Sequence, residues 1–414
     1  MLAFRRYDMT ADLRTIADEL DAADPLAPFL DEFEPAHGVS AYLDGNSLGR
    51  PLRSLPDHLA EFVRGAWGTR LIRSWDEEWM QRPYALGNRI GAVALGAAAG
   101  QTIVADSTTV LLYKLIRAAV DAQPGRTEIL IEAGNFPTDR FIVEGIARER
   151  GLRVSWITPD PIHGVSVADV EAAVTTDTAL VVLSHVDYRS GALADMQAIT
   201  EVTHMVGALI LWDLCHSAGA VEMQLDAWGV DLAVGCTYKY LNGGPGSPAF
   251  AYVNERHQGT LVQPIWGWMG ASDVFAMGPN YAPDASIRQF VSGTPPILSM
   301  IAMEGMVDLI ERAGIDQVRE KSRSLTNLAV RAYDEALAPV GVRLLSTRDA
   351  DRRGSHVTIG HERFAEVTQT LWAGGVIPDF RFPDGIRLGL SPLSTSHAEV
   401  VVGVLAVRDA LIAS

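Results

Sequence analysis

Two segments of this chain place a chemically active side chain at the end of an apolar run. Ala208 to Trp212 is short and apolar, as a buried parallel strand is, and Asp213 follows it directly. Asp231 to Cys236 has the same character and is followed by Tyr238, Lys239 and a glycine-rich turn. Because open α/β sheets bind ligands at the carboxyl ends of their strands, we expect Asp213 and Lys239 to face one site.

An acid and an amine at one site suit pyridoxal 5′-phosphate (PLP). This cofactor needs a lysine that forms a Schiff base and an acid that keeps its pyridine nitrogen protonated, so that the ring accepts electrons. Taken singly, Asp213 has an alternative as a helix N-cap, and Lys239 has one as a solvated surface amine. However, a lysine between two tyrosines that lead into a Gly-Gly-Pro-Gly turn is oddly placed for mere solvation, so the sequence favours PLP.

The phosphate of PLP requires hydroxyls, backbone donors and a helix N-terminus. Asp106 and Ser107 lie between an expected strand, Thr102 to Ala105, and an expected helix that opens near Thr108 and Thr109. The unpaired N–H groups at that helix end would point at the anion. On the residues alone, a simple Ser/Thr N-cap is an equally good interpretation.

The elements that must position these groups alternate between strand-like and helix-like segments from about residue 100 onward. This alternation is typical of an α/β fold with a mainly parallel sheet and helices on both faces. Near Pro295 and Pro296 the pattern changes to a long helical stretch, Ile297 to Ala313 and on to Leu337, and then to an α+β portion. We therefore expect an N-terminal segment (1–50) that packs with the small domain, a large PLP-binding domain (51–292) and a small domain (293–414). The expected strands are Thr102–Ala105, Glu128–Glu132, Arg153–Ile157, Ala179–Leu183, Ala208–Trp212 and Asp231–Cys236, and the expected helices are Thr10–Ala23, Thr109–Val120 and Arg140–Arg150.

Composition narrows the partners and the compartment. The 414 residues include 34 basic and 51 acidic side chains, and the resulting net charge of -17 repels nucleic acid and anionic lipid. The two cysteines, Cys215 and Cys236, are typical of core residues in a reducing compartment and not of a disulfide or a metal site. Residues 1–8 lack the apolar region of a signal peptide, and no apolar run approaches the length of a membrane span. We expect a cytoplasmic protein without nucleic-acid, membrane or metal partners.

Further segments give the chain a resemblance to kynureninase, a family of the aspartate-aminotransferase superfamily with PLP fold type I, over nearly its whole length. The Asp213 to Lys239 stretch is specific only to the superfamily, whereas Leu43–Gly49 and Phe136–Asp139 narrow the resemblance to kynureninase. The matching segments also include Ser184–Gly191, Gly267–Gly270, Gly293–Pro296 and Ile386–Leu393. The resemblance implies a central sheet sandwiched by helices, a smaller α+β domain, and a homodimer with active sites at the subunit interface.

The resemblance implies an activity as well: PLP-dependent hydrolysis of L-kynurenine to anthranilate and L-alanine, a Cβ–Cγ cleavage in tryptophan catabolism and NAD biosynthesis. Three residues would be catalytic. Lys239 would hold the cofactor and remove the Cα proton, Asp213 would pair with the pyridine nitrogen, and Tyr238 would assist hydration of the γ-carbonyl. A class V aminotransferase with the same anchors is the alternative. A cysteine desulfurase would need a catalytic cysteine on a C-terminal loop, and none follows Cys236.

The remaining contacts are also implied by the resemblance. The cofactor-binding set is Thr108, Thr109, Phe136, Asp139, Ser184, Asp213, His216, Tyr238, Lys239, Trp268 and Thr294. Phe136 would stack on the pyridine ring, and Trp268 would bind the phosphate, although both are also compatible with core aromatics. Arg387 would bind the substrate α-carboxylate bidentately, with Asn46 nearby. On the residues alone, Arg387 could equally form a surface salt bridge, and Asn46 could only shape a turn.

Substrate preference depends on two positions. Kynureninases that prefer 3-hydroxykynurenine have a His and an Asn beside the substrate ring, where this chain is expected to have Trp75 and Thr294. An indole offers stacking area to an unsubstituted ring but no good acceptor for a 3-hydroxyl, which costs about 1–3 kcal/mol. We therefore expect kynurenine to be preferred, as in the bacterial type. Trp75 and the neighbouring Trp79 are both also compatible with plain core residues.

Overall fold

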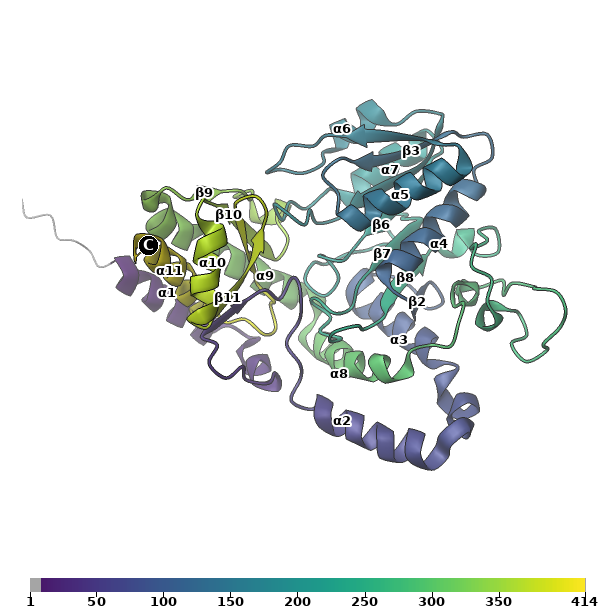
Figure 1. Ribbon diagram of the computed structural model, residues 1–414, viewed down its shortest axis with the longest axis horizontal. Coiled ribbons are helices and arrows are strands. Elements are labelled where there is room, and N and C mark those ends of the chain that lie inside the picture. Colours follow the sequence, from purple (N-terminus) through teal and green to yellow (C-terminus); the bar gives the residue numbers. More distant parts are fainter. Residues whose placement is uncertain (1–8, 414) are drawn as a thin grey trace, which may run out of the picture.

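The computed structural model describes residues 9–413 and consists of two lobes, each built around its own sheet (Figure 1). The larger lobe contains a seven-stranded sheet and the smaller lobe a five-stranded one. Residues 1–8, where the absence of a signal peptide was expected, lie outside the described residues. Within the described part of the chain, no helix has the length and apolar character needed to cross a membrane.

The large sheet has the strand order β2-β8-β7-β6-β5-β3-β4, and β8 is the one strand that runs antiparallel to its neighbours. β5 and β6 are almost wholly apolar and are buried along their whole length, because helices cover both faces of the sheet. The expected mainly parallel sheet is therefore confirmed. Its strands are β2 (Thr102–Ala105), β3 (Glu128–Glu132), β4 (Arg153–Ile157), β5 (Thr178–Ser184), β6 (Leu209–Asp213), β7 (Leu232–Gly235) and β8 (Ala249–Val253).

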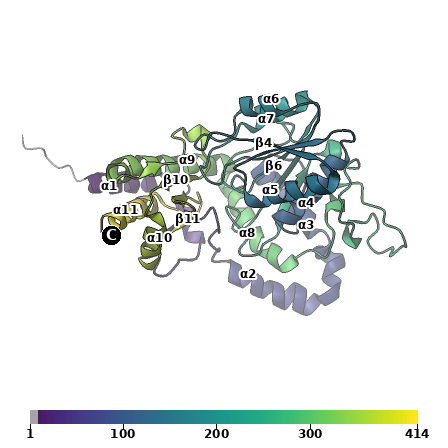
Figure 2. The same ribbon diagram turned by 45° about the horizontal axis from the view of Figure 1, so that its top comes forward.

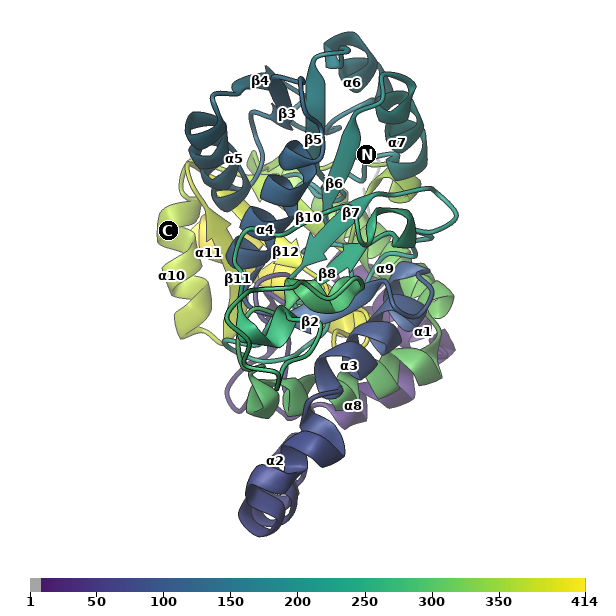
Figure 3. The same ribbon diagram turned by 90° about the vertical axis from the view of Figure 1, so that its right-hand side faces the viewer.

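Two apolar cores lie on the two faces of this sheet, and alternate residues of one strand belong to different cores. In β5, Val181 and Leu183 join one cluster, whereas Leu180 and Val182 join the other. Figure 3 shows the helices on either side of the twisted sheet. The helices of the large lobe are α2 (Leu55–Phe62), α3 (Arg82–Ile90), α4 (Thr108–Asp121), α5 (Pro137–Arg150), α6 (Val167–Ala173) and α7 (Met196–Met205).

The small lobe is formed by the C-terminal part of the chain together with the N-terminal segment. Its sheet has the order β1-β11-β12-β10-β9, in which β1 (Ala41–Leu43) pairs parallel to β11 (Val376–Arg381). Helix α1 (Met9–Ala23) packs on α11 (His397–Ala413), and the Asp21 carboxylate accepts hydrogen bonds from the first N–H groups of α11. The other elements are β9 (Arg343–Leu344), β10 (His356–Gly360), β12 (Gly385–Gly389), α9 (Ile315–Ala332) and α10 (Phe364–Ala373).

The helical stretch expected from Ile297 to Ala313 and on to Leu337 consists of two successive α-helices and a short final turn. α8 (Ile297–Ala313) ends at Gly314, whose φ of 79° is unfavourable for other residues, and α9 begins directly after it. α8 packs into the core of the large lobe against α2 and α3, whereas α9 contacts α11 in the small lobe. We therefore propose that the domain boundary lies near Gly314 and not at residue 293 as expected from the two prolines.

Irregular helical turns form an arm that leads from α2 to α3. Figures 1 and 2 both show α2 and the following turns extending away from the two sheets. The turns of the arm are Val63–Arg70, Leu71–Arg73 and Trp75–Trp79, and further short turns occupy Ala27–Glu32, Gly91–Leu95, Glu255–His257, Trp268–Gly270, Ile287–Phe290, Tyr333–Leu337, Ala338–Val340 and Ala350–Arg352. Trp75 belongs to this arm.

Candidate active site

A cavity lies at the carboxyl edge of the large sheet, where several strands deliver polar residues together. Ser184 and Asp213 end the neighbouring parallel strands β5 and β6 and are partners in register. Lys239 follows β7 and reaches the same cavity. The lining residues are Thr108, Thr109, Phe136, Thr138, Asp139, Ser184, Val186, Tyr188, Asp213, Cys215, His216, Tyr238 and Lys239. Nine of the eleven residues expected to bind the cofactor are therefore in one place, and Trp268 and Thr294 are the exceptions.

The lysine is held by a compact loop. The Gly49 N–H donates to the Tyr238 carbonyl over 2.8 Å, and a side chain at Gly49 would collide with the backbone of Lys239. Lys239 Nζ lies 3.0 Å from His216 Nε2. Burial, followed by the charge of Lys239, lowers the pKa of His216 well below its ordinary value, so this imidazole is neutral at physiological pH. A neutral histidine beside an amine can exchange a proton with it.

Three carboxyl groups influence one another here: Asp139 and Asp213 line the cavity, and the charge of the buried Glu132 acts on Asp139. Asp213 Oδ1 accepts from the Cys215 N–H over 2.7 Å, and Asp139 Oδ2 is buried without a hydrogen-bond partner among the described residues. Burial, followed by the charge of Asp213, raises the pKa of Asp139. Burial also raises the pKa of Glu132, at the end of β3, to about 8. This excess of buried acid is what a protonated ring nitrogen would neutralise, so the cluster fits the pyridine of PLP.

The N-terminus of α4 forms the part of the cavity suited to a phosphate. Ser107 caps the helix, and its hydroxyl accepts from the Val110 N–H over 3.4 Å. Thr108 and Thr109 follow in the first turn and line the cavity. Ser184 lines the cavity as well, and its hydroxyl donates to Asn135 Oδ1 over 2.8 Å. The N-cap and the phosphate-binding interpretations are thus compatible, because the cap is Ser107 and the free hydroxyls belong to its neighbours.

Aromatic side chains form the remaining walls of the cavity. Phe136 is partly exposed to the cavity and meets Tyr188 edge to face, with ring centroids 5.3 Å apart. Burial raises the pKa of Tyr238 well above its ordinary value, so its phenol keeps its proton and serves as a hydrogen-bond donor. The walls therefore offer one apolar ring face and one permanent hydroxyl donor to a flat ligand.

Arg387 is buried beside this cavity, so it is no surface salt bridge. It lies in β12, where its guanidinium bonds Asp379 of β11, the Tyr188 carbonyl (2.7 Å) and Ser47 Oγ (3.0 Å). Burial lowers the pKa of Arg387, and the charge of Asp379 partly offsets this effect by raising it. Asn46 is fully buried, and neither polar atom of its side chain has a partner among the described residues. Arginine and amide donors in one place suit a carboxylate.

Three expected site residues lie elsewhere in the chain. Trp75 is in the arm, where it packs edge-on against Trp79 with centroids 5.3 Å apart. Trp268 lies on an outlying loop near Phe275 and is 44% exposed. Thr294 is exposed as well. None of the three lines the cavity that contains Lys239.

Sequence reasoning also missed residues that the fold brings to the site. Glu132 ends a strand as Asp213 does, and this shared position was a usable signal. Asp379, the ion partner of Arg387, gave no local signal, because the pairing depends on the register of β11 with β12 (Asp379↔Arg387). Tyr188 belongs to a segment that carried the resemblance, but its role as a wall follows only from the structure.

Comparisons with known proteins agree with this geometry. A family model for the kynureninase C-terminal domain matches residues 318–407, and one for the DegT/DnrJ/EryC1/StrS aminotransferase family matches residues 97–226. A kynureninase of Burkholderia pseudomallei is 41% identical over 401 residues, which are 95% of this chain and 94% of the relative. A kynureninase of Pseudomonas fluorescens is 41% identical over 389 residues, which are 92% of this chain and 91% of the relative.

Solved structures share the fold at lower identity. The cysteine desulfurase CsdA of Escherichia coli has a TM-score of 0.79 at 16% identity and covers 94% of this chain and 98% of its own. An apo cysteine desulfurase of Thermococcus onnurineus NA1 has a TM-score of 0.78 at 16% identity, covering 90% and 95%. This likeness establishes PLP fold type I, as expected.

Proposed function

Because this chain belongs to the kynureninase family, we propose that it hydrolyses L-kynurenine to anthranilate and L-alanine with PLP as its cofactor. The observation that carries the proposal is the meeting of Lys239 and Asp213 in one cavity, with the carboxylate-binding arginine Arg387 buried beside it. The decisive assay follows anthranilate fluorescence with kynurenine as substrate. Formation of a keto acid without anthranilate would favour a class V aminotransferase instead.

The residues that would hold PLP follow from the cavity. Lys239 would anchor its aldehyde, Asp213 would face its ring nitrogen, Thr108 and Thr109 would bind its phosphate, and Phe136 would cover its ring. When bound, the cofactor supplies a carbonyl for amines and a ring that accepts electrons from the substrate. Borohydride treatment of the yellow protein should fix the cofactor to Lys239, and Lys239→Ala should abolish that linkage.

The chain's own residues handle the protons of the reaction. Lys239 Nζ removes the proton from the substrate Cα, and the neutral His216 at 3.0 Å accepts or returns a proton at Nε2. Tyr238, which keeps its proton, donates a hydrogen bond where water adds to the γ-carbonyl. Water is consumed in this addition, and cleavage of the Cβ–Cγ bond then releases anthranilate.

Arg387 and Asn46 would bind the α-carboxylate of the substrate. The guanidinium already bonds Ser47 and the Tyr188 carbonyl, so the substrate replaces these partners while Asp379 keeps the arginine in place. The unpartnered Asn46 Nδ2 would donate to the same carboxylate. Substrate binding therefore replaces hydrogen bonds that Arg387 already makes within the protein, and the guanidinium is not taken out of water at that moment. This exchange favours specificity over affinity.

We further propose that kynurenine is preferred over 3-hydroxykynurenine, with Trp75 and Thr294 near the substrate ring. The lost hydration of a 3-hydroxyl corresponds to about 5- to 150-fold in kcat/KM. The test compares both substrates in parallel and repeats the comparison with Trp75→His. Trp156→His, an exposed tryptophan of the edge strand β4, is the matched control. Equal kcat/KM values, or an unmoved ratio in Trp75→His, would refute this preference.

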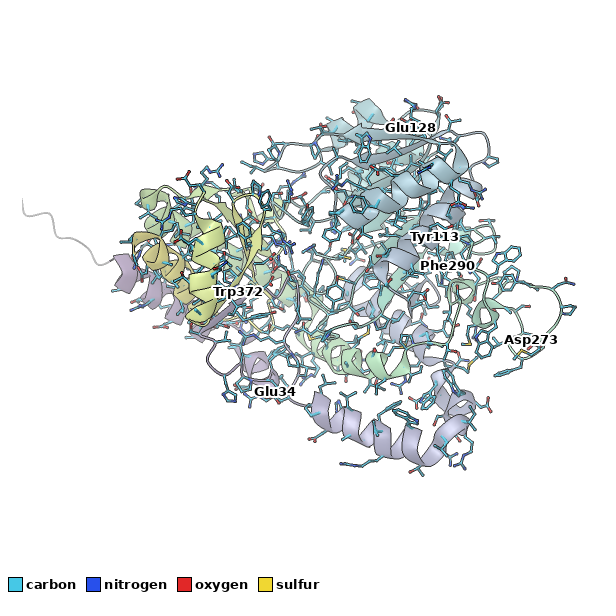
Figure 4. The ribbon with its side chains drawn as sticks, in the orientation of Figure 1. Glu34, Tyr113, Glu128, Asp273, Phe290 and Trp372 are labelled. Carbon is cyan, nitrogen blue, oxygen red and sulfur yellow. The ribbon has the colours of Figure 1, made fainter. Side chains whose placement is uncertain are left out.

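Because Trp75, Trp268 and Thr294 lie away from the cavity of their own protomer, we propose that they complete the site of a second copy in a homodimer. An outlying loop carries exposed apolar side chains: Trp266 at 63%, Phe275 at 61% and Met277 at 72%. Figure 4 marks this loop by Asp273, at the edge of the molecule. Such a surface is typical of an interface.

Mixing two inactive variants tests this dimer directly. Lys239→Ala removes the anchor in one protomer, and Trp268→Ala would remove a contact supplied by the other. Dissociation and reassociation of the two variants should restore activity, because one site of each mixed dimer then contains neither substitution. A fully active monomer on dilution would contradict the proposal.

A cytoplasmic location is also proposed, supported by the two buried free cysteines.

A further inference from the structure

His356 is a buried histidine of the small lobe for which packing gives no reason. It begins β10 and is fully inaccessible to solvent. Neither of its ring nitrogens has a hydrogen-bond partner among residues 9–413. Burying a polar ring without a partner costs free energy, so nearly all buried polar groups are paired. An unpaired imidazole beside an active site therefore requires an explanation.

The nearest aromatic neighbour of His356 belongs to the catalytic cavity. Its ring centroid lies 5.5 Å from that of His216, with the ring planes tilted by 56°. His216 Nε2 is 3.0 Å from Lys239 Nζ, and His216 Nδ1 is buried without a partner among the described residues. Lys239, His216 and His356 thus form a row that leads from the catalytic amine of the large lobe into the small lobe.

Burial, together with the cations that face His356, keeps its imidazole neutral. Burial is the largest cause that lowers its pKa, and the cations that lower it further come from three elements and the loop before β10: Arg387 of β12, Lys239 of the loop after β7, Arg381 of β11 and Arg353. His216 is the other titratable group in ring contact, and it is neutral as well. A neutral imidazole keeps one ring nitrogen as a hydrogen-bond acceptor.

The tautomer of His216 determines what this acceptor can do. When Lys239 Nζ donates to His216 Nε2, the hydrogen of the neutral His216 ring is at Nδ1. The Nδ1–H group of His216 is buried and needs an acceptor, and the neighbouring ring of His356, with its centroid 5.5 Å away, offers one. Resting on the proposed function, we propose that His356 is a positioning residue: it accepts from His216 Nδ1–H and thereby directs the Nε2 lone pair to Lys239. The two rings are not hydrogen-bonded to each other in this structure, so the bond requires a small shift of β10 towards His216.

The test replaces His356 in the PLP-loaded enzyme. His356→Gln keeps an acceptor, whereas His356→Leu has similar bulk and none. One readout is the pH titration of the visible absorption of the cofactor bound to Lys239, which needs no substrate. The other is kcat against KM for kynurenine. We expect His356→Leu to shift the titration midpoint and to lower kcat by about 5- to 150-fold, the cost of one unsatisfied buried N–H, with KM nearly unchanged. His356→Gln should restore both.

Val357→Ala is the matched control, because Val357 is the next residue of β10 and packs in the apolar core of the small lobe. It should lower thermal stability without moving the titration midpoint. The proposal is overturned if His356→Leu titrates like the wild type, or if Gln and Leu shift the midpoint equally, which indicates a purely structural role. If the wild type forms no anthranilate, the proposed function fails, while the absorption titration still decides the role of His356.

Discussion

Replacing Asp213 by Asn should separate activity from stability. The amide has the shape of the carboxylate and keeps an acceptor for the Cys215 N–H, which now bonds Oδ1 at 2.7 Å. It removes one negative charge from the group formed by Asp213, Asp139 and Glu132. The cavity therefore retains its geometry and loses the charge that faces the ring nitrogen of the cofactor.

The expected changes in kcat/KM and in melting temperature follow from two roles of the Asp213 charge. Truncating one partner of a buried, hydrogen-bonded charge pair costs about 2–5 kcal/mol, which corresponds to a loss of about 30- to 5,000-fold in kcat/KM. In the apo-protein the same charge acts unfavourably, because after burial it is the main cause that raises the pKa of Asp139. A carboxyl whose pKa is raised on folding destabilises the protein as pH rises through that pKa. Removing the cause should therefore raise the melting temperature of the apo-protein near neutral pH.

Three measurements check whether Asp213→Asn lowers activity while raising the stability of the apo-protein: anthranilate formation, cofactor affinity by absorbance, and thermal unfolding of the apo-protein. Asp226→Asn is the control, since Asp226 bonds Tyr252 Oη and the Gln101 side chain and does not line the cavity. It should lower stability and leave activity per folded molecule unchanged. The reasoning is refuted if Asp213→Asn retains activity within about tenfold, or if its apo-protein melts well below the wild type.

Three further predictions follow from the same site. Arg387→Lys loses the fork that bonds Asp379 and the Ser47 hydroxyl, so kcat/KM for kynurenine should fall at least about 30-fold, measured by steady-state kinetics. Glu132 has a pKa of about 8 against an ordinary value of 4.5, so its contribution to stability is present below pH 4.5 and lost as pH rises through 8. Glu132→Gln should therefore flatten the fall in melting temperature of the apo-protein over that interval, and an unchanged slope would contradict the assignment. Gly389→Ala places a methyl group against the Asn46 side chain, and it should cost about 1–3 kcal/mol in unfolding experiments and raise KM.

Much of the fold and the centre of the site could be predicted from the sequence. The central strands β5 and β6 are nearly continuous apolar runs, because helices bury both of their faces, and such runs are visible without a structure. Asp213 ends β6 and Lys239 follows shortly after β7, so the parallel topology alone brings them to one edge. The helical stretch expected from Ile297 to Ala313 and on to Leu337 shows the limit: the sequence does not reveal that its two helices, separated by Gly314, pack in different lobes.

The tertiary structure decided everything that depends on pairing between distant segments. Arg387 meets Ser47, 340 positions earlier in the chain, and its ion partner Asp379 is selected by the register of two strands. His356 reaches His216 only because the small lobe folds against the large one. Local periodicity reports which face of an element is buried, whereas it contains no information on which other element covers that face. The sequence by itself therefore determined the strands and the catalytic pair, and the packing of the two lobes determined the groups around them.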